Sequence, residues 1–248
     1  MSDFILDACI NPNSDMVAEV RADLGRSWDE VYGSAESIAD FARAVRAARG
    51  QAFCMLPFCH TVEAEAMGAD VNLGDEVSVA RAGTPVCTSM RDVLGMELSD
   101  ERSHRLSRMI EAARMLSEAG EQVMYSISGP VSILSCLLDL RVVFREWRRE
   151  PELVQEVLGH LRGQVIPYAL RAADAGVTYM EYADPPASVS IVGPRVATTI
   201  AEGFTTPFIR ELSARMSEGT SIFLCPMAAT EEMRSLEGAS VKVRCPKA

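Results

Sequence analysis

Several residues capable of chemistry cluster near position 60 of the chain. Cys59 and His60 follow a short apolar run and precede two carboxylates, Glu63 and Glu65. Adjacent residues point in divergent directions, so we do not expect Cys59 and His60 to bind one ion together. Carboxylates two residues apart lie on different faces of a helix. We therefore expect one to face a site and the other to face solvent, with Glu63 a candidate catalytic residue and His60 a candidate substrate-binding residue. The alternative is that an early carboxylate simply suits a helix N-terminus.

A second set of polar residues follows two later apolar runs. Ser128 and Gly129 end the segment QVMYSISGP, while Glu181, Asp184 and Ser188 lie in and after GVTYMEYADPP. If these runs are parallel strands, their C-terminal ends meet at the rim where such folds place their sites. Asp184 is then the second candidate catalytic carboxylate, and the other four are candidate substrate-binding residues. The alternative is structural, because Ser-Gly-Pro and Asp-Pro-Pro are also good turn sequences.

Two cysteines, Cys225 and Cys245, follow the last two apolar runs of the chain. On neighbouring parallel strands they would reach the same rim. Catalytic zinc takes three protein ligands and keeps one position open, so two thiolates with a histidine or carboxylate from elsewhere on the rim would suffice. Both cysteines are candidate metal ligands. The alternative is that they are buried as small apolar side chains, which is common for cysteine.

These residues need a scaffold, and the pattern of the chain predicts one. Short apolar runs alternate with segments whose apolar residues recur at helical spacing, which indicates an α/β fold with a parallel sheet. We predict strands at about 51–56, 122–128, 177–182, 220–225 and 240–244. The length of 248 residues suits a (β/α)8 TIM barrel formed as a single domain over residues 1–248. Because five strands are fewer than eight, we expect the barrel to be incomplete or truncated.

Composition excludes several classes of function. A net charge of −11 argues against a general grip on nucleic acid phosphates. No run reaches the roughly 18 apolar residues of a membrane span, and the first residues do not have the pattern of a signal peptide. Seven cysteines do not suggest a disulfide framework. We therefore expect a cytoplasmic protein that binds neither nucleic acid nor membranes.

Four segments together resemble a known family: LPFCHTVEAEAMGADVNLGDE, SISGPVSI, DAGVTYMEYADPPASVSIVGPRV and IFLCP. Their order and spacing are similar to those of the uroporphyrinogen decarboxylase superfamily over about residues 28–235, and most similar to its methylcobamide:coenzyme M methyltransferase branch. The resemblance implies a TIM barrel of one-carbon metabolism that moves a methyl group to or from the cobalt of a cobalamin-like corrinoid carried by a partner protein. In thiol-methylating members, zinc lowers the pKa of the acceptor thiol.

The chain departs from this branch at the zinc motif. The family motif reads His-x-Cys, and the matching positions here are Phe223 to Cys225, so the histidine is replaced. Cys245 matches no family ligand, and family members are usually longer at both ends. A rebuilt zinc site would use Cys225 and Cys245. Its third ligand would be Glu181, Glu63 or His60.

Two hypotheses remain open. The first is a zinc-assisted, corrinoid-dependent methyltransferase component that uses a thiol, a folate or a methylated small molecule. The alternative is a non-catalytic paralogue that acts as a binding or regulatory partner. Uroporphyrinogen decarboxylase itself is disfavoured, because its arginine-rich motif has no counterpart before Phe53 and an acidic protein suits an acidic porphyrin poorly. Under either hypothesis we expect an oligomer, since open strand edges tend to associate.

Overall fold

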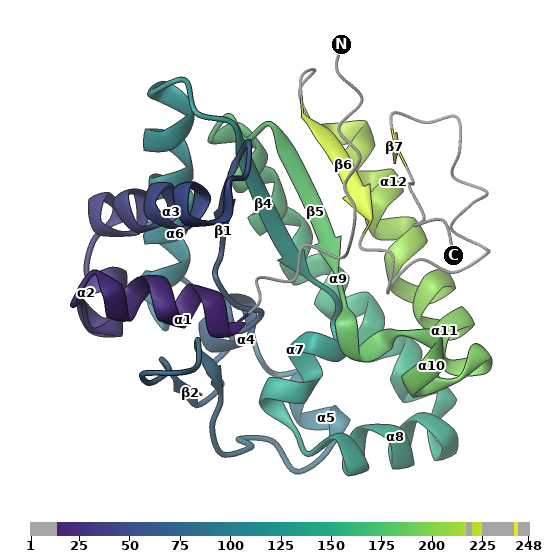
Figure 1. Ribbon diagram of the computed structural model, residues 1–248. Helices are drawn as coiled ribbons and strands as arrows, with labels where there is room; N and C mark the ends of the chain where they lie inside the picture. The colour runs from purple at the N-terminus through teal and green to yellow at the C-terminus, as the bar shows by residue number, and fades with distance from the viewer. Residues whose placement is uncertain (1–13, 217–219, 225–240, 243–248) are drawn as a thin grey trace.

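A parallel sheet forms the centre of the molecule (Figure 1). The computed structural model describes residues 14–216, 220–224 and 241–242. The strands of this sheet run in the order β1-β4-β5-β6-β7, and every pairing is parallel. They are β1 (Cys54–Leu56), β4 (Val123–Ser128), β5 (Tyr179–Ala183), β6 (Ser221–Leu224) and β7 (Val241–Lys242). Each of these five described strands overlaps a predicted strand.

The composition of the strands explains why they form a covered sheet. All six residues of β4 are buried, as are four of the five in β5. Strands that are buried on both faces favour continuous apolar runs over strict alternation. The register places Ser126 of β4 beside Glu181 of β5, and Glu181 beside Phe223 of β6. Polar residues are thus carried into an otherwise apolar sheet.

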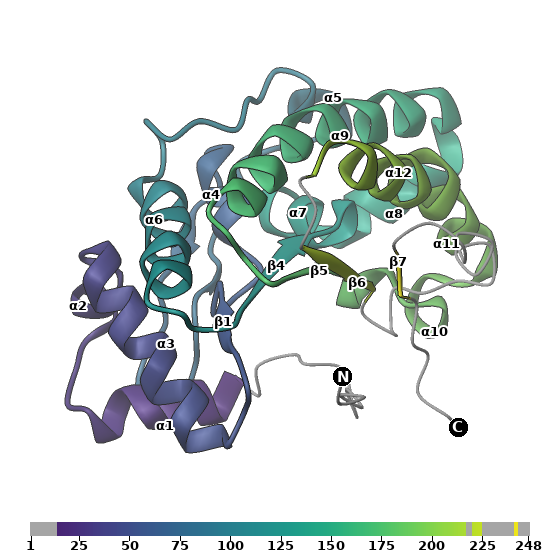
Figure 2. The ribbon, with the colours of Figure 1, turned by 90° about the horizontal axis from the view of Figure 1, so that it is seen from above.

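Helices cover one side of the sheet. Figure 2 shows α6, α9 and α12 on the same side of the strands, and the contacts of α6 and α9 with β4 agree with this view. The helices before β4 are α1 (Ser14–Asp23), α2 (Trp28–Tyr32), α3 (Ala35–Arg49), α4 (Val62–Ala66), α5 (Met90–Val93) and α6 (His104–Glu118). Those after β4 are α7 (Pro130–Leu137), α8 (Leu140–Arg149) and α9 (Pro151–Asp174). Those after β5 are η1 (Pro185–Ala187), α10 (Val189–Val192), α11 (Pro194–Ile200), η2 (Ala201–Thr205) and α12 (Thr206–Arg215).

Local sequence signals set the ends of α3. The Ser34 side chain accepts a hydrogen bond from the backbone N–H of Ser37 at the start of the helix. Gly50 ends it with a φ of 62°, the left-handed conformation that glycine adopts at little cost. Between these ends, Ile38, Phe41 and Val45 are buried. They recur at helical spacing, so α3 packs one face against β1 and α6.

Two features have no clear signal in the sequence. A short antiparallel hairpin, β2 (Val71–Asn72) with β3 (Arg81–Ala82), follows α4. The π-helical turn η2 interrupts the helical segment between α11 and α12.

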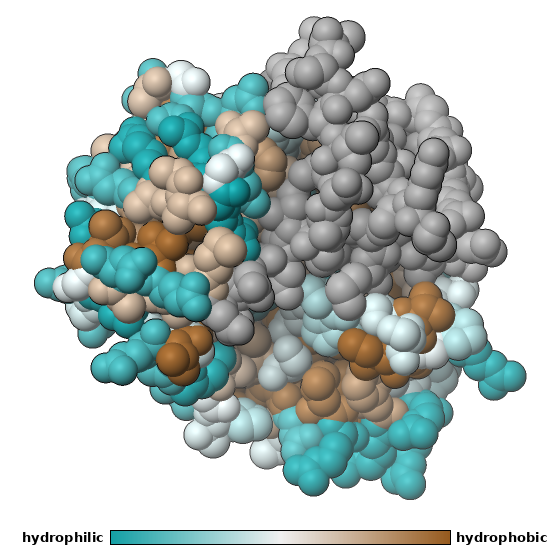
Figure 3. Space-filling view, viewed as in Figure 1, coloured by the Kyte–Doolittle hydropathy of each residue, from teal (hydrophilic) through white to brown (hydrophobic). Residues whose placement is uncertain are grey.

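At the surface, hydrophilic residues cover α8 at the lower edge of Figure 3, where the Arg141 side chain is 91% exposed. None of the described helices combines the length and apolar character needed to cross a membrane.

Candidate active site at the ends of the strands

Glu63 connects the ends of two neighbouring strands. It lies in α4, just after β1, and is fully buried. Its Oε1 accepts a hydrogen bond from the backbone N–H of Ser128 at 2.7 Å, and its Oε2 accepts one from Ser128 Oγ at 2.9 Å. Burial raises the pKa of Glu63, while the bonds from Ser128 oppose the rise. Because Ser128 is the last residue of β4, this carboxylate holds the C-terminal ends of β1 and β4 together.

Asp184, the residue after β5, connects the end of that strand to the start of α7. Its Oδ1 accepts hydrogen bonds from the backbone N–H and the Oγ of Ser132, both at 2.7 Å, and its Oδ2 accepts one from the Val131 N–H at 3.1 Å. These donors belong to the first turn of α7, where free N–H groups and the helix dipole favour an anion. Asp184 is fully buried, and this burial raises its pKa to about 6.

Gly129 leaves space for Asp184. A Cβ atom at position 129 would overlap the Cβ and carboxylate atoms of the Asp184 side chain. The Gly129 N–H also donates to the Ala183 carbonyl at 2.8 Å, so the two strand ends meet backbone to backbone. We predict Gly129 to line a substrate pocket. Its contacts also give Gly129 a structural role, because the end of β5 can approach α7 this closely only if residue 129 has no side chain.

A second polar group lies on the face of the sheet away from the helices. Tyr125 and Tyr182 direct their hydroxyls toward the helices, bonding Tyr168 of α9 at 2.7 Å and Thr205 of η2 at 2.9 Å. Side chains alternate along a strand, so the next residues, Ser126 and Glu181, point to the opposite face.

The position of Ser126 on this face is unusual. Its hydroxyl is buried and finds no hydrogen-bond partner among the described residues. Phe223 shares the face, and its ring lies edge-on to that of Tyr179 with centroids 5.2 Å apart. In a (β/α) barrel this face lines the interior. Ser126 and Glu181 are therefore placed where a ligand within the barrel would meet them.

The other two predicted substrate-binding residues flank the rim. His60 follows β1, and burial lowers its pKa to about 4, so its imidazole is neutral at pH 7. Ser188 is buried, and its Oγ lies 2.9 Å from the Oγ of Ser190. The structure thus brings His60, Glu63, Ser128, Gly129, Asp184 and Ser188 to the ends of β1, β4 and β5. Whether any of them contacts a substrate stays a prediction.

One expectation about this segment is wrong. The second carboxylate, Glu65, does not simply face solvent, because its side chain is only 22% exposed. Its Oε2 accepts hydrogen bonds from Arg105 Nε and from Ser103 Oγ, both at 2.7 Å. Helical spacing correctly separates Glu63 from Glu65 onto different faces, but it does not reveal that α6 supplies an arginine opposite the second face.

The family assignment follows from the extent of the match. The family model described as uroporphyrinogen decarboxylase (URO-D) matches residues 15–243, which includes the whole rim. The chain belongs to this family. The resemblance inferred from the four sequence segments is therefore confirmed.

Two curated relatives of this chain carry methyltransferase names. The chain is 25% identical over 213 residues to the methylcobamide:CoM methyltransferase MtaA of Methanosarcina barkeri, covering 84% of this chain and 61% of that protein. It is 25% identical over 207 residues to the methylcobamide:CoM methyltransferase MtbA of Methanosarcina acetivorans, covering 81% and 60%. The chain thus spans about three-fifths of the length of the curated relatives it matches.

A solved structure shows the same fold. A methyltransferase from Methanosarcina mazei superposes with a TM-score of 0.67 at 19% sequence identity, over 95% of this chain and 76% of that one. This likeness supports the TIM-barrel class that the strand pattern predicts. At this identity it carries the fold and not the activity.

The zinc site is the part of the family pattern that the described residues do not reproduce. Nowhere in residues 14–216, 220–224 and 241–242 do three His, Cys, Asp or Glu side chains gather closely enough to hold a metal ion. Phe223 offers no donor atom at the position of the family histidine. The candidate ligands Cys225 and Cys245 lie outside the described residues. The described residues therefore leave the predicted zinc site untested.

Sequence reasoning missed two residues of this region. Ser132 supplies two of the three bonds to Asp184, and Arg105 holds Glu65. Ser132 was detectable in principle, because it is the third residue of a helix that begins at Pro130, a position whose N–H has no partner within the helix. Arg105 gives no such local signal.

Proposed function

We propose that this URO-D family member transfers a methyl group between a corrinoid protein and a small-molecule acceptor or donor. The observation that carries the proposal is the family match, which spans every residue of the rim, together with relatives named methylcobamide:CoM methyltransferases. A barrel mouth held by Glu63 and Asp184 suits such a reaction, because the small molecule and the corrinoid of the partner protein need a fixed meeting place.

The chemistry requires an electrophilic methyl group, which a methylcorrinoid on the partner protein supplies. An acceptor R–XH forms a bond from X to the methyl carbon, the electron pair of the broken carbon–cobalt bond remains on cobalt, and the proton of R–XH passes to a base. We assign the proton to Glu181, which is buried on the barrel-interior face. Ser126, beside it in register, offers a hydroxyl to orient the acceptor.

Glu63 and Asp184 act differently in this proposal. Both are fully buried and receive several donors, so they hold protein atoms in place. We therefore assign them positioning roles at the ends of β1, β4 and β5.

Phe223 favours one alternative, a non-catalytic paralogue that binds a partner on the same scaffold. A phenyl ring in place of a metal-binding histidine removes one means of activating an acceptor thiol. Under this alternative the rim is retained as structure while the reaction is lost.

A methyl-transfer assay separates the two. The full chain is incubated with methylcobalamin and, in separate reactions, with a thiol and with a reduced folate, while the methylcorrinoid absorbance is followed. Faster loss of the methylcorrinoid with matching formation of methylated acceptor supports the enzyme. Rates equal to the protein-free reaction with every acceptor support the paralogue. Zinc analysis of the same preparation, beside a Cys225→Ala variant, tests the zinc-assisted form separately.

A further inference from the structure

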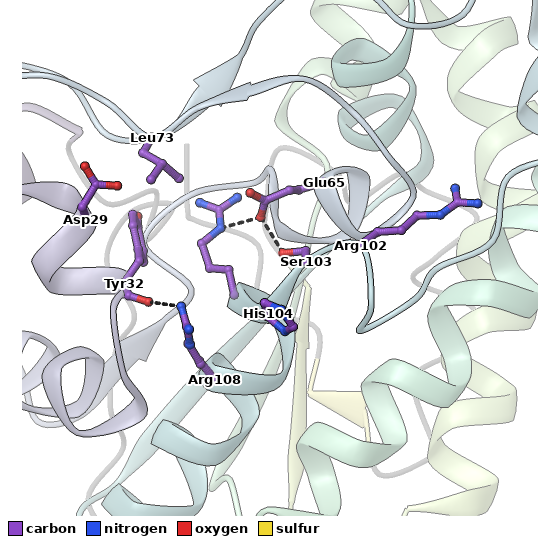
Figure 4. A pocket seen from close by; sticks show the side chains of 9 residues that line it. Asp29, Tyr32, Glu65, Leu73, Arg102, Ser103, His104 and Arg108 are labelled. Carbon is purple, nitrogen blue, oxygen red and sulfur yellow. Dashed lines mark hydrogen bonds and ion pairs between the residues drawn. The ribbon is translucent and has the colours of Figure 1, made fainter.

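Arg105 of α6 is a buried charge that binds more than its ion-pair partner. Its side chain is 4% exposed, and its Nε donates to Glu65, which also accepts from Ser103 (Figure 4). Its terminal nitrogens donate to Cys59 Sγ at 3.5 Å and to Thr61 Oγ1 at 2.8 Å. A buried charge needs a partner, and Glu65 provides one. The bonds to Cys59 and Thr61 therefore require a separate explanation.

The residues that Arg105 holds belong to one short segment after β1. Cys59 and Thr61 flank His60 in the loop, and Glu65 lies in α4, for which Thr61 is the N-cap residue. Thr61 makes no side-chain capping bond, and α4 has only five residues. Because helices this short are marginal on their own, the loop and α4 depend on tertiary contacts to keep one arrangement. Arg105 supplies three such contacts from a 15-residue helix.

His60 differs from its two neighbours in how the fold uses it. Its backbone carbonyl accepts a bond from Cys136 Sγ of α7 at 3.9 Å. Its imidazole is partly exposed and makes no hydrogen bond with another described residue. The backbone of residue 60 is thus held from α6 and α7, whereas its polar side chain is left unbonded at the rim. Such a side chain is available to a ligand.

We propose that Arg105 is a positioning residue for the small-molecule site: it fixes the loop that presents His60, and His60 binds the methyl acceptor or donor. This inference rests on the proposed methyl transfer. An imidazole can donate through one ring nitrogen and accept through the other, so it can orient an X–H group. Glu181 keeps its role as the proton acceptor.

The α4 helix gives Arg105 a second route to the rim. Glu65 lies on one face of α4, and Glu63 on another face bonds the end of β4 through Ser128. A change at Arg105 can therefore reach the rim through Glu63 as well as through His60. The experiment must separate these two routes.

Arg105→Lys is the informative substitution. A guanidinium presents its donors from three nitrogens in a fixed plane, whereas an ammonium carries the same charge on one atom of a flexible chain. Lysine therefore keeps the charge opposite Glu65 but cannot reproduce the bonds to Cys59 and Thr61 at the same time.

NMR of the imidazole groups tests the positioning without an assay of methyl transfer. The chain has three histidines, so the His60 signal is identified by its loss in His60→Gln. We expect it to shift or split in Arg105→Lys, while the signal of His160, which is bonded to a backbone carbonyl, stays in place. Arg114→Lys is the matched control, because Arg114 lies on the same helix but pairs with Glu111 at the surface. An unchanged His60 signal in Arg105→Lys overturns the proposal.

Steady-state methyl transfer tests the role of His60, with the thiol or the reduced folate that the wild type methylates. We expect KM for this acceptor to rise about tenfold in His60→Gln and in Arg105→Lys, with kcat changed less than about threefold. The double variant should be no weaker than His60→Gln alone, because Arg105 acts through His60. Additive increases overturn the proposal and indicate the route through Glu63. An unchanged KM in His60→Gln overturns it as well.

Failure of this inference and failure of the proposed function are distinguishable. Absence of methyl transfer by the wild type overturns the proposed function and with it the substrate role of His60, whereas the NMR result for Arg105 stands on its own. Should Arg105→Lys fail to fold, Thr61→Val takes its place, because it removes one loop acceptor of Arg105 and keeps the branched shape. The same shift of the His60 signal is then expected.

Discussion

Glu63 and Ser128 are bonded through both oxygens of the carboxylate, although 65 positions separate them in the chain. One oxygen accepts from the backbone N–H and the other from the hydroxyl, so the contact fixes both the position of β4 and the rotamer of its last residue. Together with the bonds from Ser132 to Asp184, it connects the ends of three consecutive parallel strands, β1, β4 and β5. The rim is thus held by buried charge-assisted bonds that span the strands.

Replacement of Glu63 by glutamine tests this connection. An amide has one acceptor oxygen, so one of the two donors of Ser128 would face an NH2 group in a buried site. We expect a loss of about 1–3 kcal/mol in the free energy of unfolding, measured by urea titration. The control is Glu111→Gln at the surface of α6, for which a change below about 0.5 kcal/mol is expected. Equal losses for the two variants would contradict the assigned role.

Replacement of Gly129 by alanine tests the close approach of Asp184. The added methyl group overlaps the Asp184 side chain, so β5 or α7 must shift. We expect a loss of about 1–3 kcal/mol in stability. The matched control is Gly163→Ala in α9, where an added Cβ meets no described atom within 4 Å. Because alanine is the better helix former, this control should be neutral or slightly stabilising. A neutral Gly129→Ala would count against the packing described here.

The two serines of β4 should respond in opposite ways to alanine. Ser126 carries a buried hydroxyl without a described partner, so its removal should leave stability unchanged or raise it by up to about 1 kcal/mol. Ser128 bonds Glu63, so Ser128→Ala should lower the free energy of unfolding by about 1–3 kcal/mol. Thermal or urea unfolding of both variants checks the pair. A destabilising Ser126→Ala would indicate a partner for that hydroxyl.

The pH dependence of the free energy of unfolding tests the raised pKa that burial gives Asp184. Its folded pKa of about 6 lies above the ordinary value of 3.8, so the folded state binds the proton more tightly. The stability that this group contributes is therefore fully present below about pH 4 and is lost as pH rises to about 6. The stability of the wild type relative to Asp184→Asn should fall across this interval, when both are unfolded in urea at each pH. A difference that rises or stays constant would contradict the raised pKa.

Glu181→Gln tests the proposed proton acceptor. The amide keeps the size of the side chain but cannot take the proton of the methyl acceptor. In the methyl-transfer assay we expect kcat to fall about 100-fold or more while KM changes little. A parallel fall for the surface variant Glu111→Gln, or an unchanged kcat in Glu181→Gln, would remove Glu181 from this role.

The local sequence pattern was sufficient to predict the strands and the family. Apolar runs such as the one before Pro57 and the one ending at Ser128 predict buried strands, because a parallel sheet covered on both faces needs continuous apolar residues. The rule that parallel strands place their C-terminal ends on one rim then brings Glu63, Ser128 and Asp184 together without knowledge of their contacts.

The chain by itself therefore determined which residues reach the rim, and the tertiary structure decided what each one does there. Asp184 finds its donors 52 positions back in the chain, and Glu65 finds Arg105 40 positions ahead. Spacing along a helix or strand fixes which side chains share a face, but not what lies opposite that face. For this reason Glu65, expected in solvent, is paired with an arginine. The pocket that Glu65 lines together with residues of α2 and α6 likewise exists only once these helices are packed together (Figure 4).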